Sequence, residues 1–356
     1  MRLGPFQQFL KYLRLIHKGV LFSFEGIDDV NAAIDSFMEK HLTSEVYPAF
    51  RDALMYPIKV GGKRIRPILV MLSAEAAGGS AQAAIPAATA FELAHNGTLI
   101  FDDIIDRGEL RRGNVSAWKK YGEAAAILIA LRYREAIVRV LSESKHPLEI
   151  ESLVSKVIDD VIEGEMLDIS LERAGRDEPL FSGFRKKEVT VDDYLFMIRK
   201  KTASLFEGCC RAGAIVADAP PSTEKALSTY GLNLGYLFQI TDDILDIFGA
   251  EEEFGKKIGK DIMEHKGGNI VILLGLQMLN DEQKRMLARG LVKESVTEKE
   301  VTELIGVLRS AGLDRESRTF ASKYEEEMNK ALRSLPETDA RSMLEALPGI
   351  LLQRRH

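Results

Sequence analysis

The chain has 356 residues, of which 46% are hydrophobic and 29% are charged. This balance supports a large buried core and excludes a mostly disordered chain. The formal net charge of -6 excludes the general basic surface of nucleic-acid-binding proteins, so we expect no nucleic acid as a partner.

Apolar runs and cysteine spacing exclude two further classes of protein. No stretch approaches the run of about 20 apolar residues that a membrane-spanning helix needs, so we expect no transmembrane segment. The two cysteines, Cys209 and Cys210, are neighbours in a helical pattern and cannot link distant segments by disulfides. Their spacing favours a reducing compartment, and we expect a cytoplasmic protein.

Residues 1–26 are predicted to form an N-terminal amphipathic extension. Basic residues such as Arg14 and Lys18 are mixed with apolar ones such as Phe9 and Leu13, without the apolar core and cleavage site of a signal peptide. We interpret the extension as a surface or partner-docking helix. Weak contact with a membrane surface is the alternative.

Residues 27–356 are predicted to form one all-α domain. Apolar residues recur at three- and four-residue intervals, which is the period of a helix, and no alternating strand pattern is present. None of the breaks between helices is a long linker, so one domain is favoured over two. The longest irregular stretch, 173–188, is interpreted as an insertion. Glycine and proline are predicted to break the helices at 61–62, 78–79, 108–113, 147, 179–183, 220–221, 249 and 267–268.

The segment from Gly61 to Pro67 is the first with a chemical pattern. Lys63 and Arg66 lie at the start of a predicted helix, behind a double glycine. Backbone N–H groups at a helix start attract anions, and lysine and arginine suit phosphate oxygens. A solvated helix end is the alternative for such a cluster taken alone.

An Asp-Asp-x-x-Asp motif occurs twice, at 102–106 and at 242–246. On a helix, the first and last aspartates of each motif share one face and repel each other. The apolar residues that precede both motifs predict buried helices, in which carboxylates need a compensating cation. Mg2+ fits because it binds one or two carboxylates and completes its shell with water and phosphate oxygens. A solvated acidic face is the alternative for one copy, but two copies favour a diphosphate site.

Cationic and polar residues lie near both acidic motifs. Arginines at 111–112 follow the first motif, while lysines at 200–201 and 256–257 flank the second. His95 lies seven residues before Asp102, about two turns back on the same helix face. That position favours a role in binding, although a lone histidine in a helix is more often structural.

These motifs resemble the trans-isoprenyl diphosphate synthases of the polyprenyl synthetase family, with the closest likeness to archaeal geranylgeranyl and polyprenyl members. The resemblance covers residues 27–335 and implies an isoprenoid synthase-type helical bundle around a central cavity, and a homodimer. It rests on the motifs at 61–67, 92–95, 102–106, 111–113, 201–203, 238–239, 242–246 and 255–256.

The resemblance implies a prenyltransferase that joins isopentenyl diphosphate head to tail to an allylic diphosphate. The product would be a trans-prenyl diphosphate of C20 or longer. The cofactor would be Mg2+, with three ions expected and Mn2+ as a substitute. Asp102, Asp106 and Asp242 would lead in binding the metal, supported by Asp103, Asp243 and Asp246.

The substrate-binding residues implied by the resemblance fall into two sets. Arg111, Lys201 and Lys256 would bind the allylic diphosphate, with Thr202 and Gln239 near the reacting carbons. The retained Lys266 would also bind substrate, although its setting differs from the family pattern. The diphosphate of isopentenyl diphosphate would be held by Lys63, Arg66, His95 and Arg112.

A chain-length pocket is expected along the helix that precedes Asp102. Gly97, Thr98 and Ala94 are small, whereas family members that stop at farnesyl length usually carry bulky aromatics at the first two positions. Phe91 is the first large residue and lies about 16 Å below Asp102, so it is the expected floor. The alternative is that Gly97 only permits close helix packing.

Some segments depart from the family pattern, and two other functions stay open. Ala130-Leu131 replaces a usual Gly-Asp pair, and Glu165 replaces a common glutamine. His265 to Gly268 replaces Gly-Lys-x-Thr. A catalytically silent subunit of a heteromeric synthase would tend to lose aspartates or arginines. A class I terpene cyclase would carry an Asn/Ser/Glu motif in place of the second acidic motif.

Overall fold

The structure is a computed structural model, and several predicted features lie outside the residues it describes. Those outside are the N-terminal extension, Lys256, Lys266, and half of the predicted insertion. The described residues are 27–171, 179–184, 186, 188–249, 258–263, 268–293 and 296–352.

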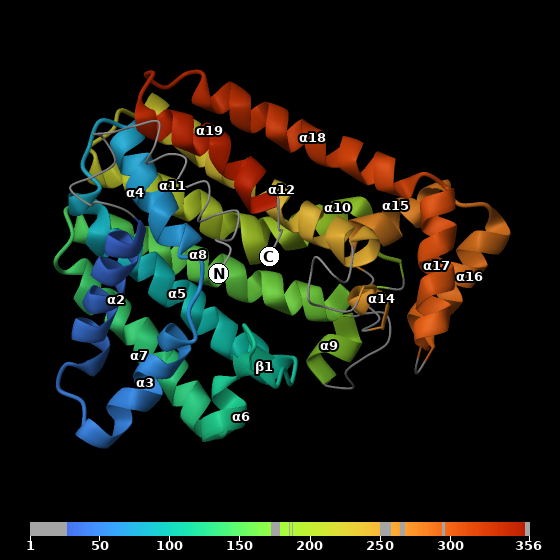
Figure 1. The fold of residues 1–356 in the computed structure, drawn as a ribbon, viewed down its shortest axis with the longest axis horizontal. Helices are drawn as coiled ribbons and strands as arrows, with labels where there is room; N and C mark the ends of the chain where they lie inside the picture. Colours follow the sequence, from blue (N-terminus) through green and yellow to red (C-terminus); the bar gives the residue numbers. More distant parts are fainter. Residues whose placement is uncertain are drawn as a thin grey trace.

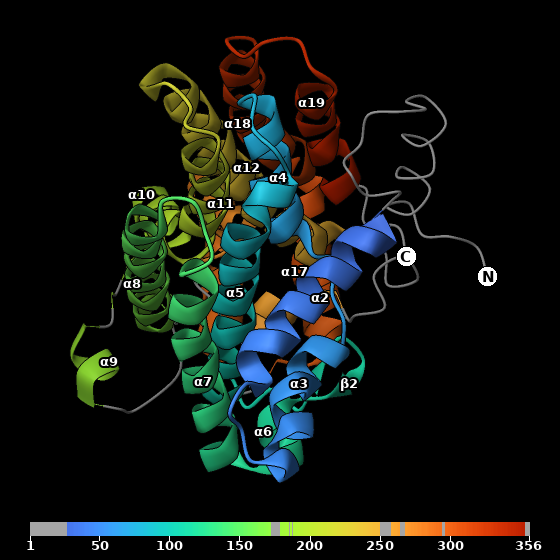
Figure 2. The same ribbon diagram turned by 90° about the vertical axis from the view of Figure 1, so that its left-hand side faces the viewer.

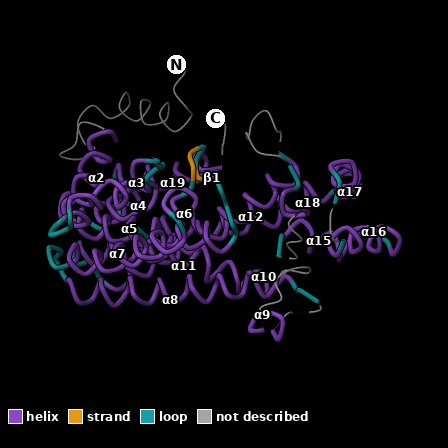
Figure 3. Tube along the Cα trace, turned by 90° about the horizontal axis from the view of Figure 1, so that it is seen from below, coloured by secondary structure: helices purple, strands orange, loops and turns teal. Residues whose placement is uncertain are grey.

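Helices form nearly all of the regular structure in the described residues, so the prediction of an all-α fold is confirmed (Figure 3). The first half of the chain contains α2 (Ile27–Thr43), α3 (Arg51–Lys59), α4 (Ile65–Ala76), α5 (Ile85–Ile105), α6 (Ala117–Tyr121), α7 (Glu123–Leu141) and α8 (Pro147–Leu171). The middle contains α9 (Pro179–Phe184), α10 (Val191–Ile198), the π-helical turn η3 (Arg199–Ala203), α11 (Ser204–Val216) and α12 (Pro221–Phe248). The last part contains α14 (Lys260–Met263), α15 (Ile270–Met278), α16 (Asp281–Val292), α17 (Glu298–Ser310), α18 (Leu313–Leu332) and α19 (Asp339–Leu352).

The long helices form a bundle with α5, α11 and α12 at its centre (Figure 1). α5 packs against α2, α4, α7, α8 and α11, while α12 packs against α11 and α18. Figure 2 shows α7 and α8 along one side of α5 and α2 on the other. One contiguous cluster of buried apolar side chains runs from α2 to α19. None of the described helices is long and apolar enough to cross a membrane.

Most of the predicted helix breaks are confirmed. α8 starts at Pro147, and α12 starts at Pro221 and ends next to Gly249. The prediction of a break at 179–183 is wrong, because the short helix α9 occupies this segment. A proline at a helix start loses no hydrogen bond, so Pro179 begins this helix rather than interrupting it.

A short hairpin after α5 escaped prediction. β1 (Leu110–Arg111) pairs with β2 (Asn114–Val115), and two residues per strand are too few to show an alternating pattern. Arg112 and Gly113 form the turn, with φ values of 53° and 75°. Positive φ at both turn residues matches the twist of a two-residue hairpin loop.

Ala130-Leu131, which departs from the family pattern, lies on α7. The next two residues form hydrogen bonds to the segment after α2 and to α3. Arg132 Nη2 donates to the Ser44 carbonyl at 2.8 Å. Tyr133 is fully buried, and its hydroxyl group donates to the Leu54 carbonyl at 2.6 Å. Ala130 is buried as well, whereas Leu131 is 50% exposed, so only the first residue of this pair packs into the core.

The contact between α4 and α11 generates a prediction about stability. A Cβ atom at Gly213 of α11 would lie 2.7 Å from the Ala74 backbone nitrogen of α4, which is far too close. Gly213→Ala is therefore expected to lower the free energy of unfolding by about 1–3 kcal/mol in urea denaturation. Gly306→Ala is the matched control, because a Cβ there meets nothing within 4 Å. It should raise stability by about 1 kcal/mol, and equal effects would refute the packing argument.

Candidate active site

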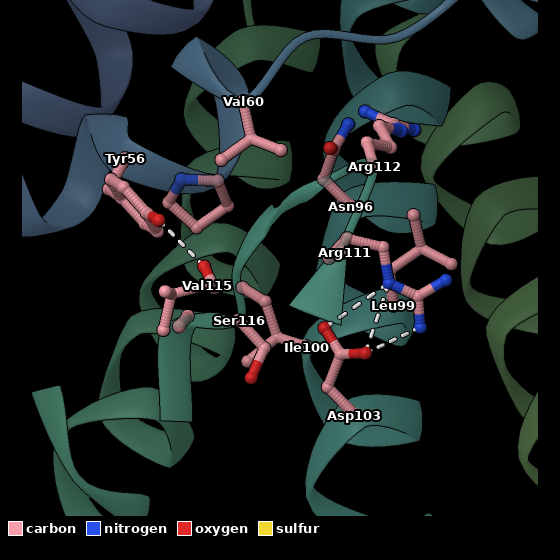
Figure 4. A pocket seen from close by; sticks show the side chains of 12 residues that line it. Tyr56, Val60, Asn96, Leu99, Ile100, Asp103, Arg111, Arg112, Val115 and Ser116 are labelled. Atoms are coloured by element: carbon pink, nitrogen blue, oxygen red, sulfur yellow. Dashed lines mark hydrogen bonds and ion pairs between the residues drawn. The ribbon is translucent and has the colours of Figure 1, made fainter. Parts of the chain in front are cut away.

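The first acidic motif lies at the C-terminal end of α5, where its three aspartates differ in their surroundings. Asp103 is buried, and both of its carboxylate oxygens accept hydrogen bonds from Arg111 of β1 (Figure 4). The shortest of these contacts joins Arg111 Nη2 to Asp103 Oδ1 at 2.6 Å. Asp102 is half-buried and Asp106 is exposed. The middle aspartate therefore anchors the hairpin, while the outer two share one face of the helix end.

The hairpin is fixed to the bundle by two further hydrogen bonds. Tyr56 Oη donates to the Val115 carbonyl at 2.6 Å, and Trp118 Nε1 donates to the Gly108 carbonyl at 2.7 Å. Figure 4 shows the pocket that results between α3, α5 and the hairpin, lined by Arg111 and Arg112. Both predicted arginines are thus held beside α5.

A buried arginine fixes the segment that carries Lys63 and Arg66. The Arg64 guanidinium group contacts Glu92 Oε1 and Asp35 Oδ1, each at 2.8 Å. Arg64 also has a positive φ of 48°, which turns the backbone into α4. The predicted residues Lys63 and Arg66 flank Arg64, so their positions depend on this buried ion pair.

The structure brings the predicted residues Arg66, His95 and Arg112 together. Arg112 lies over Gly62, because a Cβ atom at Gly62 would be 2.5 Å from Arg112 Nη1. The Arg66 guanidinium carbon is 5.1 Å from the centroid of the Phe206 ring. Burial, and then the charges of Arg66 and Arg112, lower the pKa of His95 well below its usual range. At neutral pH the cluster therefore offers arginine charge and a neutral imidazole.

The second acidic motif, near the C-terminal end of α12, repeats the pattern of the first. Its middle aspartate, Asp243, is buried and accepts hydrogen bonds from Gln239 Nε2 and from the first backbone N–H of α15, each at 3.0 Å. Asp246 accepts the backbone N–H of Asp261 at 3.1 Å. Asp242 is half-buried and shares a helix face with Asp246. Here too, the middle carboxylate fixes a neighbouring segment.

Lys201 and Thr202 of η3 link the two motifs. Thr202 Oγ1 donates to Gln239 Oε1 at 3.0 Å, and Gln239 donates in turn to Asp243. On its other side, the Lys201 ammonium group is close enough to Asp102 for that carboxylate to raise its pKa. Figure 1 shows α5, α8 and α12 running toward the same part of the bundle. Three predicted segments that lie far apart in the sequence thus meet at one site.

Lys201 is held tightly against α8. Its ammonium group contacts Glu165 Oε2 at 2.6 Å and Asp168 Oδ2 at 2.5 Å. A Cβ atom at Gly164 would collide with the Lys201 backbone nitrogen, so glycine permits this close approach. Burial lowers the pKa of Lys201, but the carboxylates of Asp168, Glu165 and Asp102 outweigh burial and hold the pKa well above its usual range. Lys201 is therefore a cation at neutral pH.

The outer aspartates carry negative charge that protein cations offset only in part. Burial, followed by the Glu165 carboxylate, raises the pKa of Asp102 to about 7. Burial, followed by Asp261, raises the pKa of Asp246 to about 7. No group of three or more His, Cys, Asp or Glu side chains in the described ranges is arranged to hold an ion by itself. Carboxylate pairs one helical turn apart nevertheless fit a hard divalent cation, which would relieve their repulsion.

Phe91, the predicted floor of the chain-length pocket, lies at the junction of three helices. It is fully buried on α5. A Cβ atom at Gly208 of α11 would lie 2.8 Å from the Phe91 ring and 2.7 Å from Val157 of α8. Ala94, one turn closer to the motif, is also buried. The ring thus blocks the space between α5, α8 and α11.

Gly97 and Thr98 lie between Phe91 and the first motif. A Cβ atom at Gly97 would be 3.8 Å from the Tyr133 Cβ atom of α7, which is an ordinary contact. Helix packing therefore does not require glycine at this position. Thr98 is half-buried, and its hydroxyl group donates to the His95 carbonyl at 2.9 Å.

Three acidic residues of the site were assigned no role by the sequence motifs. Glu165 and Asp168 contact Lys201, and Asp261 lies beside Asp246. Glu165 and Asp168 lie three residues apart on a helix, which places them on one face. This spacing was the one feature of the sequence that could have indicated that they act together. Asp261 had no such indication, because a turn at 258–259 brings it back to α12.

Known proteins resemble the chain over most of its length. A family model described as polyprenyl synthetase matches residues 47–308. The geranylgeranyl diphosphate synthase of Methanosarcina mazei is 33% identical over 331 residues, which cover 92% of this chain and 95% of that protein. The octaprenyl diphosphate synthase of Escherichia coli is 30% identical, with 91% and 95% covered. The solved structure of the geranylgeranyl pyrophosphate synthetase from Pyrococcus horikoshii has a TM-score of 0.82 at 29% identity, with 92% and 97% covered.

The buried pair of Asp103 and Arg111 generates a prediction about the hairpin. Asp103→Asn removes the charge opposite Arg111 and is expected to cost about 1–3 kcal/mol of unfolding free energy. Trp118, the only tryptophan, donates a hydrogen bond to the Gly108 carbonyl, next to the hairpin. When the hairpin loosens, water should reach the indole ring and shift its fluorescence emission to longer wavelength. Asp52→Asn is the control, because Asp52 pairs with Lys59 on the exposed surface. If the two variants match in stability and emission, Asp103 does not anchor the hairpin.

Proposed function

The chain belongs to the polyprenyl synthetase family, and we propose that it is a Mg2+-dependent trans-prenyltransferase. It would join isopentenyl diphosphate head to tail to an allylic diphosphate and form a trans-prenyl diphosphate of C20 or longer. The observation that carries this proposal is the link that Lys201 and Thr202 form between the two acidic motifs. The names of the geranylgeranyl and octaprenyl diphosphate synthases among its relatives support the product range.

Three of the four outer aspartates are the proposed leading metal ligands. Asp103 and Asp243 are engaged by protein donors, which supports a secondary role for them. Mg2+ bound there would supply positive charge opposite the diphosphate groups. Three ions are proposed, with Mn2+ as a substitute. The leading ligands would be Asp102, Asp106 and Asp242, with Asp246, Asp103 and Asp243 in support.

The allylic diphosphate is proposed to bind between the two motifs. Arg111 is oriented by Asp103 through its Nε and Nη2 atoms, so its Nη1 group is directed elsewhere and suits a phosphate oxygen. Lys201 provides a second cation. Lys256 and Lys266 stay candidates outside the described residues. Thr202 and Gln239, which hydrogen-bond each other, would lie near the reacting carbons.

The diphosphate of isopentenyl diphosphate is proposed to bind at the cluster of Lys63, Arg66, His95 and Arg112. Arginine forks match phosphate oxygens in two-point contacts. His95 would donate a hydrogen bond without adding charge, since its pKa is lowered by burial and the nearby arginines. The two substrates would then lie on adjacent sides of α5.

The proposed reaction needs little covalent help from the protein. The carbon–oxygen bond of the allylic diphosphate breaks, the isopentenyl double bond attacks the allylic carbon, and the released diphosphate accepts the proton. Side chains of the site would hold both reactants in place and stabilise the departing negative charge. Phe91 would stop the growing hydrocarbon tail between α5, α8 and α11.

An exposed apolar stripe on α7 supports a homodimer. Single exposed apolar residues are ordinary, but several on one side of a helix favour a covered surface. We propose that a second copy of the chain covers it. Light scattering should then give about twice the 39.7 kDa chain mass, and a monomeric mass would reject the dimer. The stripe consists of Ile127, Leu128, Leu131 and Val138 on α7, and the neighbouring helix α8 also exposes Ile162 and Met166.

We further propose that residues 27–356 act as one domain and that 1–26 is a separate amphipathic extension. Cys209 and Cys210 are both buried and unbonded, which supports a cytoplasmic location.

The proposed activity is tested by incubating the purified protein with Mg2+, isopentenyl diphosphate and a series of allylic primers. Prenyl alcohols of C20 or longer are expected after phosphatase treatment, and removal of Mg2+ with a chelator should abolish them. Asp242→Asn should lower the rate by about 100-fold or more, because a carboxylate that would hold Mg2+ at the reacting diphosphate is lost. Asp314→Asn, which breaks an exposed pair, should leave the rate unchanged. If no primer is extended, the silent-subunit interpretation is favoured.

Product length tests the proposed floor. Phe91→Ala should lengthen the products by opening the space below the ring, and Gly97→Phe should shorten them. Because Phe91→Ala costs about 3–5 kcal/mol of stability, Phe91→Leu provides a milder change in the same direction. Gly97→Ala should change little, since a Cβ there makes only ordinary contacts. Chromatography of the prenyl alcohols measures the outcome, and unchanged lengths in all variants would reject this pocket.

A further inference from the structure

Glu165 contacts a lysine that is assigned to substrate. Its Oε2 atom lies 2.6 Å from Lys201 Nζ, so the pair is in direct contact. The side chains of Glu165 and Lys201 are 12% and 27% exposed, so water screens this pair only in part. The chain therefore places a negative charge directly on a cation that the proposed function assigns to substrate.

The surroundings of Lys201 show what this charge does. An ammonium group has three donors, and two of them point at Glu165 and Asp168. The Glu165 carboxylate contacts Lys201 and also raises the pKa of Asp102, so it lies near the first acidic motif. A diphosphate that approaches Asp102 and Lys201 must therefore meet the Glu165 carboxylate.

The neighbouring lysine provides an internal comparison. Lys200 lies next in the chain but reaches the other side of α8, because Gly164 lets η3 lie directly on that helix. Its ammonium group contacts Asp160 at 2.5 Å and Glu163 at 2.9 Å. Glu163 is 53% exposed. Neither of the two carboxylates that contact Lys200 belongs to the proposed site. The same kind of pair thus occurs twice, once at the site and once away from it.

We propose that Glu165 is a positioning residue that holds Lys201 in the absence of substrate and competes with the allylic diphosphate for its ammonium group. This inference rests on the proposed function, since it assigns Lys201 to a diphosphate. A carboxylate accepts a stronger hydrogen bond from a cation than a neutral amide does, and it also repels phosphate. Glu165 therefore weakens binding of the allylic substrate and of the diphosphate released in the same place, which favours release.

Glu165→Gln tests the proposal against wild type and against Glu163→Gln as the matched control. Calorimetry with inorganic diphosphate in Mg2+ should show about threefold to tenfold tighter binding for Glu165→Gln, as expected when a charged competitor becomes neutral. The KM for the allylic primer should fall by a similar factor, while the KM for isopentenyl diphosphate stays unchanged. Glu163→Gln should match wild type in all three constants.

The outcomes separate this inference from the proposed function. If wild type extends a primer but Glu165→Gln binds diphosphate no more tightly, the inference is wrong. Weaker diphosphate binding together with a higher Mg2+ requirement would also overturn it and make Glu165 a metal ligand. If wild type extends no primer, the proposed function fails, while tighter diphosphate binding by Glu165→Gln would still support competition at Lys201. Equal melting temperatures confirm that both variants fold.

Discussion

The site depends on how one lysine is placed among the carboxylates of two helices. Lys201 interacts with Asp102 at the end of α5 and with Glu165 and Asp168 on α8. Its neighbour Thr202 is hydrogen-bonded to Gln239, which donates in turn to the buried Asp243 of α12. Carboxylates at a half-buried position cannot remain close to one another without positive charge. Lys201 supplies part of that charge, and the raised pKa values of Asp102 and Asp246, both about 7, show that more is needed.

The middle residue of each acidic motif has a different task from the outer two. Asp103 turns inward to Arg111, and Asp243 turns inward to Gln239 and the start of α15. Each buried carboxylate thereby fixes a segment that carries other residues of the site. A motif of two adjacent aspartates combines both tasks because neighbours on a helix point about 100° apart. One carboxylate faces the ligand while the next holds the surrounding structure.

The sequence predicted the all-α fold and the family, and both are confirmed. Local periodicity and helix breakers were sufficient to predict the helices, because a helix is formed by residues that are close together in the chain. The sites at Lys201 and Asp246 depend on contacts between segments far apart in the sequence. Spacing indicated only that Asp168 shares a helix face with Glu165, and it gave no indication for Asp261. The hairpin after α5 was too short to show a strand pattern, although its Arg-Gly turn fixes Arg111. The wrong break at 179–183 shows that proline starts helices as well as ending them.

The two proposed diphosphate sites differ in the sign of their net charge before any ligand binds. Around His95, the arginines at 64, 66, 111 and 112 outnumber the carboxylates of Glu92, Asp35 and Asp103. The imidazole is neutral because burial, and then those arginines, lower its pKa. This cluster attracts an anion by itself. Around Lys201 the balance is reversed, because Glu165, Asp168 and Asp102 surround one ammonium group. A diphosphate is repelled there unless divalent cations first change the sign of the charge. The same helix, α5, carries His95 on one turn and Asp102 two turns later, so the distance between an anion-attracting site and a cation-attracting site is fixed by helical rise alone.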